Sequence, residues 1–198
     1  AFQARQDRRV DKRSGVSQRL PISTLENVAS NAERRALVAG EPVAAARVTD
    51  IYASLPSMTG KFELEYEGEL VGGAAIAREL IRRAADATLR HHAPHAGTDD
   101  IVIWFDEGAA LQVAEDANAK LLRSAFETVP GLVALVLEHD LAPSTDDGLT
   151  AFACELVLEA LVARRKISRS DRGRYGRAQQ EQGRRRRGGD VPPDAFEG

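Results

Sequence analysis

The chain contains little sulfur: its 198 residues include one cysteine, Cys154, and one methionine, Met58. A single thiol can form neither an intrachain disulfide nor a cysteine metal cluster, so both are excluded as sources of stability. Cys154 lies within a helical apolar pattern, where we expect a small buried side chain. Because the only methionine is internal, we also expect residue 1 to lie inside a longer protein.

Long hydrophobic runs are absent as well. No stretch of the sequence approaches the roughly 18 consecutive apolar residues that a membrane-spanning helix needs. The basic N-terminal segment also lacks the apolar core of a signal peptide. These absences predict a cytoplasmic protein with no membrane partner.

Charge is distributed unevenly along the chain, although the net charge is only −3. Residues 1–19 hold six Lys or Arg against two acids, and residues 163–198 hold eleven against five, which leaves ten against 23 between them. Phosphate-rich polymers bind to concentrated positive charge, so the acidic central segment is not expected to bind nucleic acid. Only the basic C-terminal tail is expected to contact polyanions, and weakly.

Apolar residues recur at helical spacing through most of the central segment, which predicts a mainly α fold of the helical-bundle type. Ser23 and Glu26 form a capping-box pattern that predicts a helix start, and Gly40 predicts the end of that helix. A long helix is expected to follow Gly73. The clearest helix contains Cys154 and is preceded by polar capping residues at 144–147.

One stretch alternates apolar and acidic residues instead, with Phe62, Leu64 and Tyr66 on one side. This alternation predicts a short strand, for which residues 110–113 are a candidate partner. The sequence therefore predicts at most one short strand pair.

These patterns divide the chain into three regions. We expect a basic junction over residues 1–19, a helical region over 20–168 and an Arg- and Gly-rich tail over 169–198. The tail has almost no aliphatic residues and so cannot bury enough surface to offset the entropy lost on ordering. It is predicted to be disordered.

Several motifs that could carry chemistry are incomplete. His91, His92 and His95 lie close together, but the adjacent pair would point apart on a helix and Pro94 interrupts the segment, so no metal site is expected. The G-x-x-x-x-G-K-[ST] phosphate loop does not occur in the chain. No grouping of Ser, His and an acid is evident either, so no catalytic residue is assigned.

Four stretches of the sequence resemble one family. The first is DKRSGVSQR, residues 11–19, followed by an Ala-rich helical pattern. Weaker likenesses are VTDIYASLP at 48–56 with TGKFELEYEGE at 59–69, and VARRKISRS at 162–170. Together they resemble the junction, helical lid and C-terminal extension of AAA+ ATPases of the magnesium-chelatase I-subunit type, which are often labelled sigma-54-interacting regulators.

The resemblance implies a function for three residues. In that family a Ser-x-Arg pattern supplies the sensor 2 arginine, which contacts nucleotide; the matching residues here are Ser17 and Arg19, with Gly15 shaping the approach. The resemblance also implies ATP and Mg²⁺ as cofactors of the complete protein, a homo-oligomeric ring, usually of six subunits, and a partner carrying a von Willebrand factor A domain. The phosphate loop, the magnesium ligands and the arginine finger of such proteins are missing here, so the chain alone is expected to be inactive.

Arginine is chemically suited to a position beside the phosphates of a nucleotide. Phosphoryl transfer spreads charge over the γ-phosphate oxygens, and arginine offers a permanent charge and a planar fork of donors. The alternative is that Arg19 only forms a surface ion pair with an acid such as Glu26 or Glu33. At the level of the whole chain, the alternatives are a non-enzymatic helical scaffold that binds a protein partner through its acidic surface, and an ATP-dependent transcriptional regulator.

Overall fold

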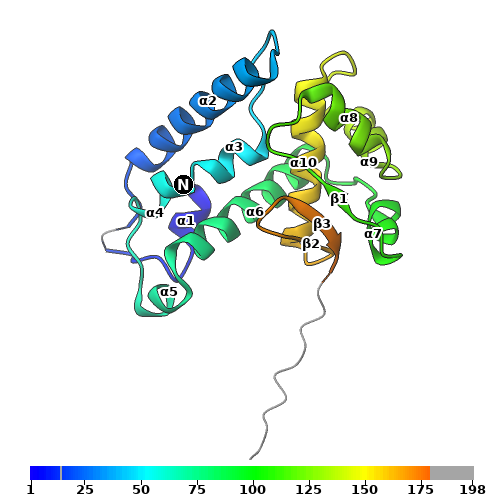
Figure 1. Ribbon diagram of the computed structural model, residues 1–198. Coiled ribbons are helices and arrows are strands. Elements are labelled where there is room, and N and C mark those ends of the chain that lie inside the picture. Colours follow the sequence, from blue (N-terminus) through cyan, green and yellow to red (C-terminus); the bar gives the residue numbers. More distant parts are fainter. Residues whose placement is uncertain (14, 179–198) are drawn as a thin grey trace, which may run out of the picture.

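The computed structural model describes residues 1–13 and 15–178, and it is mainly helical, as the periodicity predicts (Figure 1). The helices of the N-terminal half are α1 (Phe2–Gln6), α2 (Arg19–Ala39), α3 (Val48–Ala53), α4 (Leu55–Thr59), α5 (Tyr66–Val71) and α6 (Gly73–His92). The helices of the C-terminal half are α7 (Asp99–Asp106), α8 (Ala119–Glu127), α9 (Leu132–Glu138) and α10 (Asp147–Ala163). No helix in the described ranges combines the length and the apolar character needed to cross a membrane.

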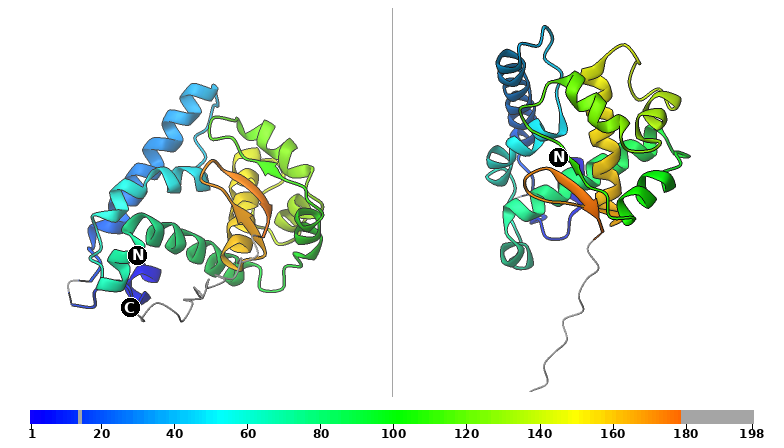
Figure 2. Two further views of the ribbon diagram at one scale, coloured as in Figure 1. Left: turned by 60° about the horizontal axis from the view of Figure 1, so that its bottom comes forward. Right: turned by 45° about the vertical axis from the view of Figure 1, so that its right-hand side comes forward.

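The helices α6 and α10 form the centre of the molecule. They cross and pack against each other, and α8, α9 and the small sheet cover the remaining sides of α10 (Figures 1 and 2). Because α10 is enclosed in this way, residues on all of its faces are buried. Its start agrees with the predicted cap, since the Asp146 carboxylate accepts a hydrogen bond from the Leu149 N–H at 2.9 Å.

The helix α2 ends where it was expected to end but begins earlier. Gly40 terminates it in the left-handed conformation, with φ +68°. The predicted start at the Ser23 capping box is wrong, because the helix already begins at Arg19. Pro21 lies in the first turn, where a backbone N–H has no intrahelical acceptor, so a proline costs no hydrogen bond there.

A three-stranded antiparallel sheet replaces the predicted strand pair. Its strands are β1 (Leu111–Gln112), β2 (Ile167–Arg169) and β3 (Arg174–Arg177), in the order β1-β3-β2. Phe62 and Leu64 do not pair with β1; they form isolated antiparallel bridges with Val16 and Val10, and the chain turns helical at Tyr66. The alternating stretch therefore joins the basic junction to the helical body.

The predicted disorder of the whole tail from residue 169 is wrong for its first part. Residues 167–177 form the β2-β3 hairpin, which packs against α10 in Figure 2. Tyr175 supplies the apolar surface that the tail was thought to lack: its ring is buried, and its hydroxyl donates to Glu159 at 2.7 Å. The rest of the predicted tail, residues 179–198, lies outside the described residues.

The hairpin is expected to contribute to stability. A chain that ends at Ser170 loses the buried Tyr175 ring and its hydrogen bond, and these together should be worth about 3 kcal/mol. Its melting temperature should therefore fall by about 10 °C in a chain of this length. A chain that ends at Ala178 keeps every described contact of the hairpin and is the matched control. Equal melting temperatures for the two truncations, measured by circular dichroism, would contradict a structural role for the hairpin.

Cys154 is fully buried on α10, as expected. Burial raises the pKa of its thiol to about 12, and the neighbouring Glu155 charge adds to this shift. Because the thiolate is the reactive form, a chromogenic disulfide reagent should label Cys154 in denaturant but not in native buffer. Rapid labelling of the folded chain, followed by absorbance, would show that α10 is not enclosed.

Candidate functional site

The loop that enters α2 brings the three predicted site residues together. Gly15 has φ +68°, which favours glycine, and its N–H donates to the Asp11 carbonyl at 3.1 Å. Ser17 follows: its N–H donates to the Lys61 carbonyl at 2.8 Å, and its Oγ accepts from the Arg19 N–H at 3.2 Å. Ser17 thereby fixes the first turn of α2 against the alternating stretch, and Arg19 is the first residue of that turn.

The Arg19 side chain is exposed at the start of α2. Among the residues that the structure describes, its guanidinium forms no ion pair, either with Glu26 or with Glu33. The alternative in which Arg19 serves only as a surface ion-pair partner thus gains no support. The cation is left available to an anion brought by another part of the protein or by a ligand.

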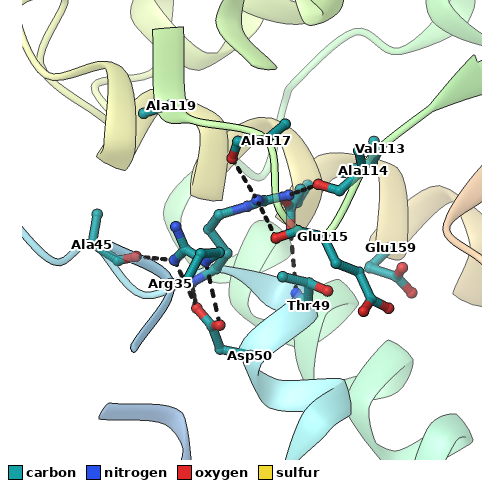
Figure 3. Close-up of polar contacts among 12 residues, drawn as sticks. Arg35, Ala45, Thr49, Asp50, Val113, Ala114, Glu115, Ala117, Ala119 and Glu159 are labelled. Carbon is teal, nitrogen blue, oxygen red and sulfur yellow. Dashed lines mark hydrogen bonds and ion pairs between the residues drawn. The ribbon is translucent and has the colours of Figure 1, made fainter. Parts of the chain in front are cut away.

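The other end of α2 is held by a buried arginine. Arg35 donates to Asp50 of α3, with Nη2 at 2.9 Å from Oδ2, and to the Ala45 carbonyl at 2.6 Å. Its Nη1 lies 3.5 Å from Glu41 Oε2. Figure 3 shows Arg35 and Asp50 facing each other across the gap between α2 and α3. Two-pronged contacts of this kind fix orientation as well as distance.

Arg47 extends this network into the core. Its side chain is 1% exposed and faces Glu155 of α10, which is 2% exposed, with Nε 2.7 Å from Oε1. The remaining donors reach the carbonyls of Ala114 at 3.2 Å and Ala117 at 3.3 Å (Figure 3). Burial raises the pKa of Glu155, and the Arg47 charge opposes that shift.

The two arginines share one carboxylate on α3. Asp50 accepts the backbone N–H of Arg47 at 2.8 Å as well as the Arg35 guanidinium. Arg35, Asp50, Arg47 and Glu155 therefore form a continuous chain of contacts from α2 through α3 to α10. We call these four residues the buried charge network.

One turn further along α10, Glu159 accepts two tyrosine hydroxyls: Tyr52 of α3 at 2.8 Å and Tyr175 of β3 at 2.7 Å. The Arg169 guanidinium stacks over the Tyr52 ring, 4.1 Å from its centroid, and its Nε lies 2.9 Å from Glu159. Burial raises the pKa of both tyrosines above the ordinary value, and the Glu159 charge adds to the shift. Both phenols therefore remain protonated donors and attach α3 and the hairpin to α10.

The helix α2 connects the exposed Arg19 to the buried charge network. Arg19 and Arg35 lie sixteen residues apart on one helix, about 24 Å along its axis at ~1.5 Å per residue. Any force on the exposed Arg19 would act on a helix whose far end is held by the buried charge network.

The structure offers no site for a metal among the described residues. The side chains of His91, His92 and His95 are exposed around the end of α6.

Comparisons with protein-family models, curated proteins and solved structures gave no significant match for this chain.

Sequence reasoning missed the buried charge network. Glu155 and Glu159 carried a usable signal, because two acids four residues apart interrupt a helix that is otherwise apolar. Such acids must be paired if they are enclosed. No comparable signal marked Arg47, since its neighbours in the sequence resemble those of an exposed loop arginine.

Removal of Arg47 should destabilise the chain strongly. Arg47→Met leaves Glu155 buried without its partner, which is expected to cost about 3–5 kcal/mol in the free energy of unfolding. Arg34→Met, at an exposed position on α2, should change that free energy by less than about 0.5 kcal/mol. Urea unfolding of both variants measures the difference, and equal effects would contradict the importance of the pair.

The loss in Arg47→Met should depend on pH. Burial raises the folded-state pKa of Glu155 and the Arg47 charge opposes this rise, so removal of Arg47 should raise that pKa further and make the folded variant bind a proton more readily than the folded native chain does. Protonation removes the unpaired charge, and the destabilisation should therefore shrink as the pH falls from about 7 to about 5. Urea unfolding of the variant and the native chain at both pH values tests this sign. A difference that stays constant or grows would show that the unpaired carboxylate is not its cause.

Proposed function

We propose that this chain is the helical lid and C-terminal extension of an AAA+ ATPase of the magnesium-chelatase I-subunit type, and that Arg19 contacts the phosphates of ATP. The resemblance in residues 11–19 suggests this role. The observation that carries it is the position of Arg19: exposed, without an ion pair among the described residues, and held by Ser17 at the first turn of α2. A guanidinium carries a permanent charge, and its planar fork of donors matches the oxygen geometry of phosphate.

In the complete protein, ATP and Mg²⁺ would be held chiefly by elements that this chain lacks. The cation at Arg19 would sense the nucleotide, and α2 would carry the change in position to the helical body. On this proposal the protein works in the cytoplasm as a homo-oligomeric ring, with six subunits as the expected number. The ring would remodel a partner that carries a von Willebrand factor A domain.

Arg19→Ala in the full-length protein should lower the ATPase rate while leaving folding intact. Loss of one charged contact to the transferring phosphate should raise the barrier by about 2–4 kcal/mol. Arg19→Lys should rescue only part of the rate, because an ammonium keeps the charge but loses the fork. Arg34→Ala, at another exposed arginine of α2, is the matched control. Normal turnover of an intact Arg19→Ala ring would eliminate the proposed contact.

The 198-residue chain by itself should not hydrolyse ATP, because its sequence contains no phosphate loop. Phosphate release should equal the buffer blank. Turnover that persists through repurification and is lost on mutating a residue of this chain would contradict the proposed division between catalytic and sensing parts.

A protein-interaction scaffold is the second candidate, and one observation favours it. Several large apolar side chains of α2 are exposed, with Leu25 at 69% and Leu37 at 84%. Exposed apolar surface often marks a contact with another protein. The two candidates differ in the effect of Arg19→Ala, because a scaffold without nucleotide chemistry would retain partner binding and have no ATPase rate to lose.

A further inference from the structure

A mainly apolar hollow of about 410 Å³ lies between α6 and the helices α1, α3, α4 and α10, which can be followed in Figure 1. Its volume is within the usual range of small-ligand sites. The wall formed by α6 runs from Ala77 to Thr88, and the other walls include Ile51 of α3, Met58 of α4 and Phe152 of α10. At ~1.5 Å per residue, the hollow therefore extends about 16 Å along α6.

The lining is uncharged. None of the side chains that surround the hollow, all of them within the described residues, is ionisable; Gln3 and Thr88 supply its polar groups, and Phe2, Phe62 and Phe152 supply three aromatic rings. Water in such a hollow finds few hydrogen-bond partners, so an apolar molecule that displaces it gains the free energy of apolar burial. An ionised ligand would lose its hydration without meeting an opposite charge. The lining therefore favours an uncharged, apolar ligand.

The deep part of the hollow belongs to the core, whereas one edge is open. Ala4 is 1% exposed, Ala77 0% and Ala85 6%, so their methyl groups form a buried floor. Ala84 and Thr88 also line the hollow but are exposed, so they mark its opening. Interiors of this kind are close-packed and hold their shape. The hollow is thus a preformed site with an entrance beside Ala84.

The dimensions of the hollow restrict the ligand further. A volume of about 410 Å³ spread over a length of about 16 Å gives a mean cross-section of about 25 Å². An α-helix with its side chains is about 10 Å wide, a cross-section of about 80 Å², so a partner helix does not fit. A hydrocarbon chain is about 4 Å wide, or roughly 15 Å², and does fit.

We propose that the hollow binds one unbranched aliphatic chain with an uncharged polar end. The chain would lie along α6 against the buried alanines. The Gln3 amide and the Thr88 hydroxyl supply donors and acceptors for a neutral polar end such as an alcohol. This site is separate from the proposed nucleotide contact, because Arg19 is not part of the lining.

Binding of linear alcohols to the 198-residue chain tests the proposal, measured by displacement of the fluorescent probe N-phenyl-1-naphthylamine. The affinity should rise about fourfold with each methylene group from hexan-1-ol to decan-1-ol, because each buried methylene adds apolar surface. Decanoate has the same chain length but carries a charge, and it should bind at least about tenfold more weakly than decan-1-ol.

Variants at the opening locate the binding. Ala84→Phe places a ring at the entrance and should weaken decan-1-ol binding about tenfold or more, and Ala84→Leu, which adds less volume, should weaken it less. Ala29→Phe makes the same change at an exposed alanine of α2 outside the lining and should leave binding unchanged. Because both alanines are exposed, folding should be intact, and thermal melting of each variant checks this. Arg19→Ala should bind decan-1-ol normally whatever its effect on ATP turnover.

Four results would overturn the proposal. Decan-1-ol could fail to displace the probe, which would leave the hollow without an aliphatic ligand. Ala84→Phe and Ala29→Phe could have equal effects, which would indicate adsorption to apolar surface in general. Decanoate could bind as tightly as decan-1-ol, which would require a cation that the lining does not provide. An amphipathic helical peptide of leucine and lysine could displace the probe at lower concentration than decan-1-ol, which would make a protein segment the ligand. Preference for the alcohol together with dependence on Ala84 would support the aliphatic site.

Discussion

The ion pair between Arg47 and Glu155 constrains the rest of the structure. These residues lie 108 positions apart, and both side chains are buried. Because a buried charge without a partner is costly, the chain must fold so that the two side chains meet. A hydrophobic pair of the same volume could be equally stable, but it would not require a specific partner. Arg47 also binds carbonyls of the segment that leads into α8. One guanidinium thus fixes the relative positions of α3, α8 and α10.

The sequence was sufficient to predict features that depend on neighbouring residues. Gly40 ends α2 because it can adopt a positive φ, and Asp146 caps α10 because its carboxylate reaches the next turn. The hairpin could not be predicted in the same way, because its stability comes from the burial of Tyr175 beside Glu159, a contact across sixteen residues. Arg47 was missed for a related reason, since only the folded chain shows which carboxylate it faces. Of the candidate site, the sequence indicated Arg19 and its loop but gave no sign of the network that holds the far end of α2.

The contacts around α2 suggest how nucleotide binding at one end of this helix could change the position of the helical body. Arg19 is exposed at the start of the helix, whereas Arg35 is buried near its end and binds Asp50. Because Asp50 also accepts a hydrogen bond from Arg47, a displacement of α2 would disturb contacts of the buried core. On the proposed function, these contacts would couple nucleotide binding at Arg19 to the position of the lid.

The proposed contact between Arg19 and the terminal phosphate of ATP is tested most directly by the affinity of the full-length protein for ATP and for ADP, measured at equilibrium with native Arg19 and with Arg19→Ala. A contact to the γ-phosphate predicts that the substitution weakens ATP binding by about tenfold or more relative to ADP. An equal loss for both nucleotides, or no loss for either, would contradict the claim.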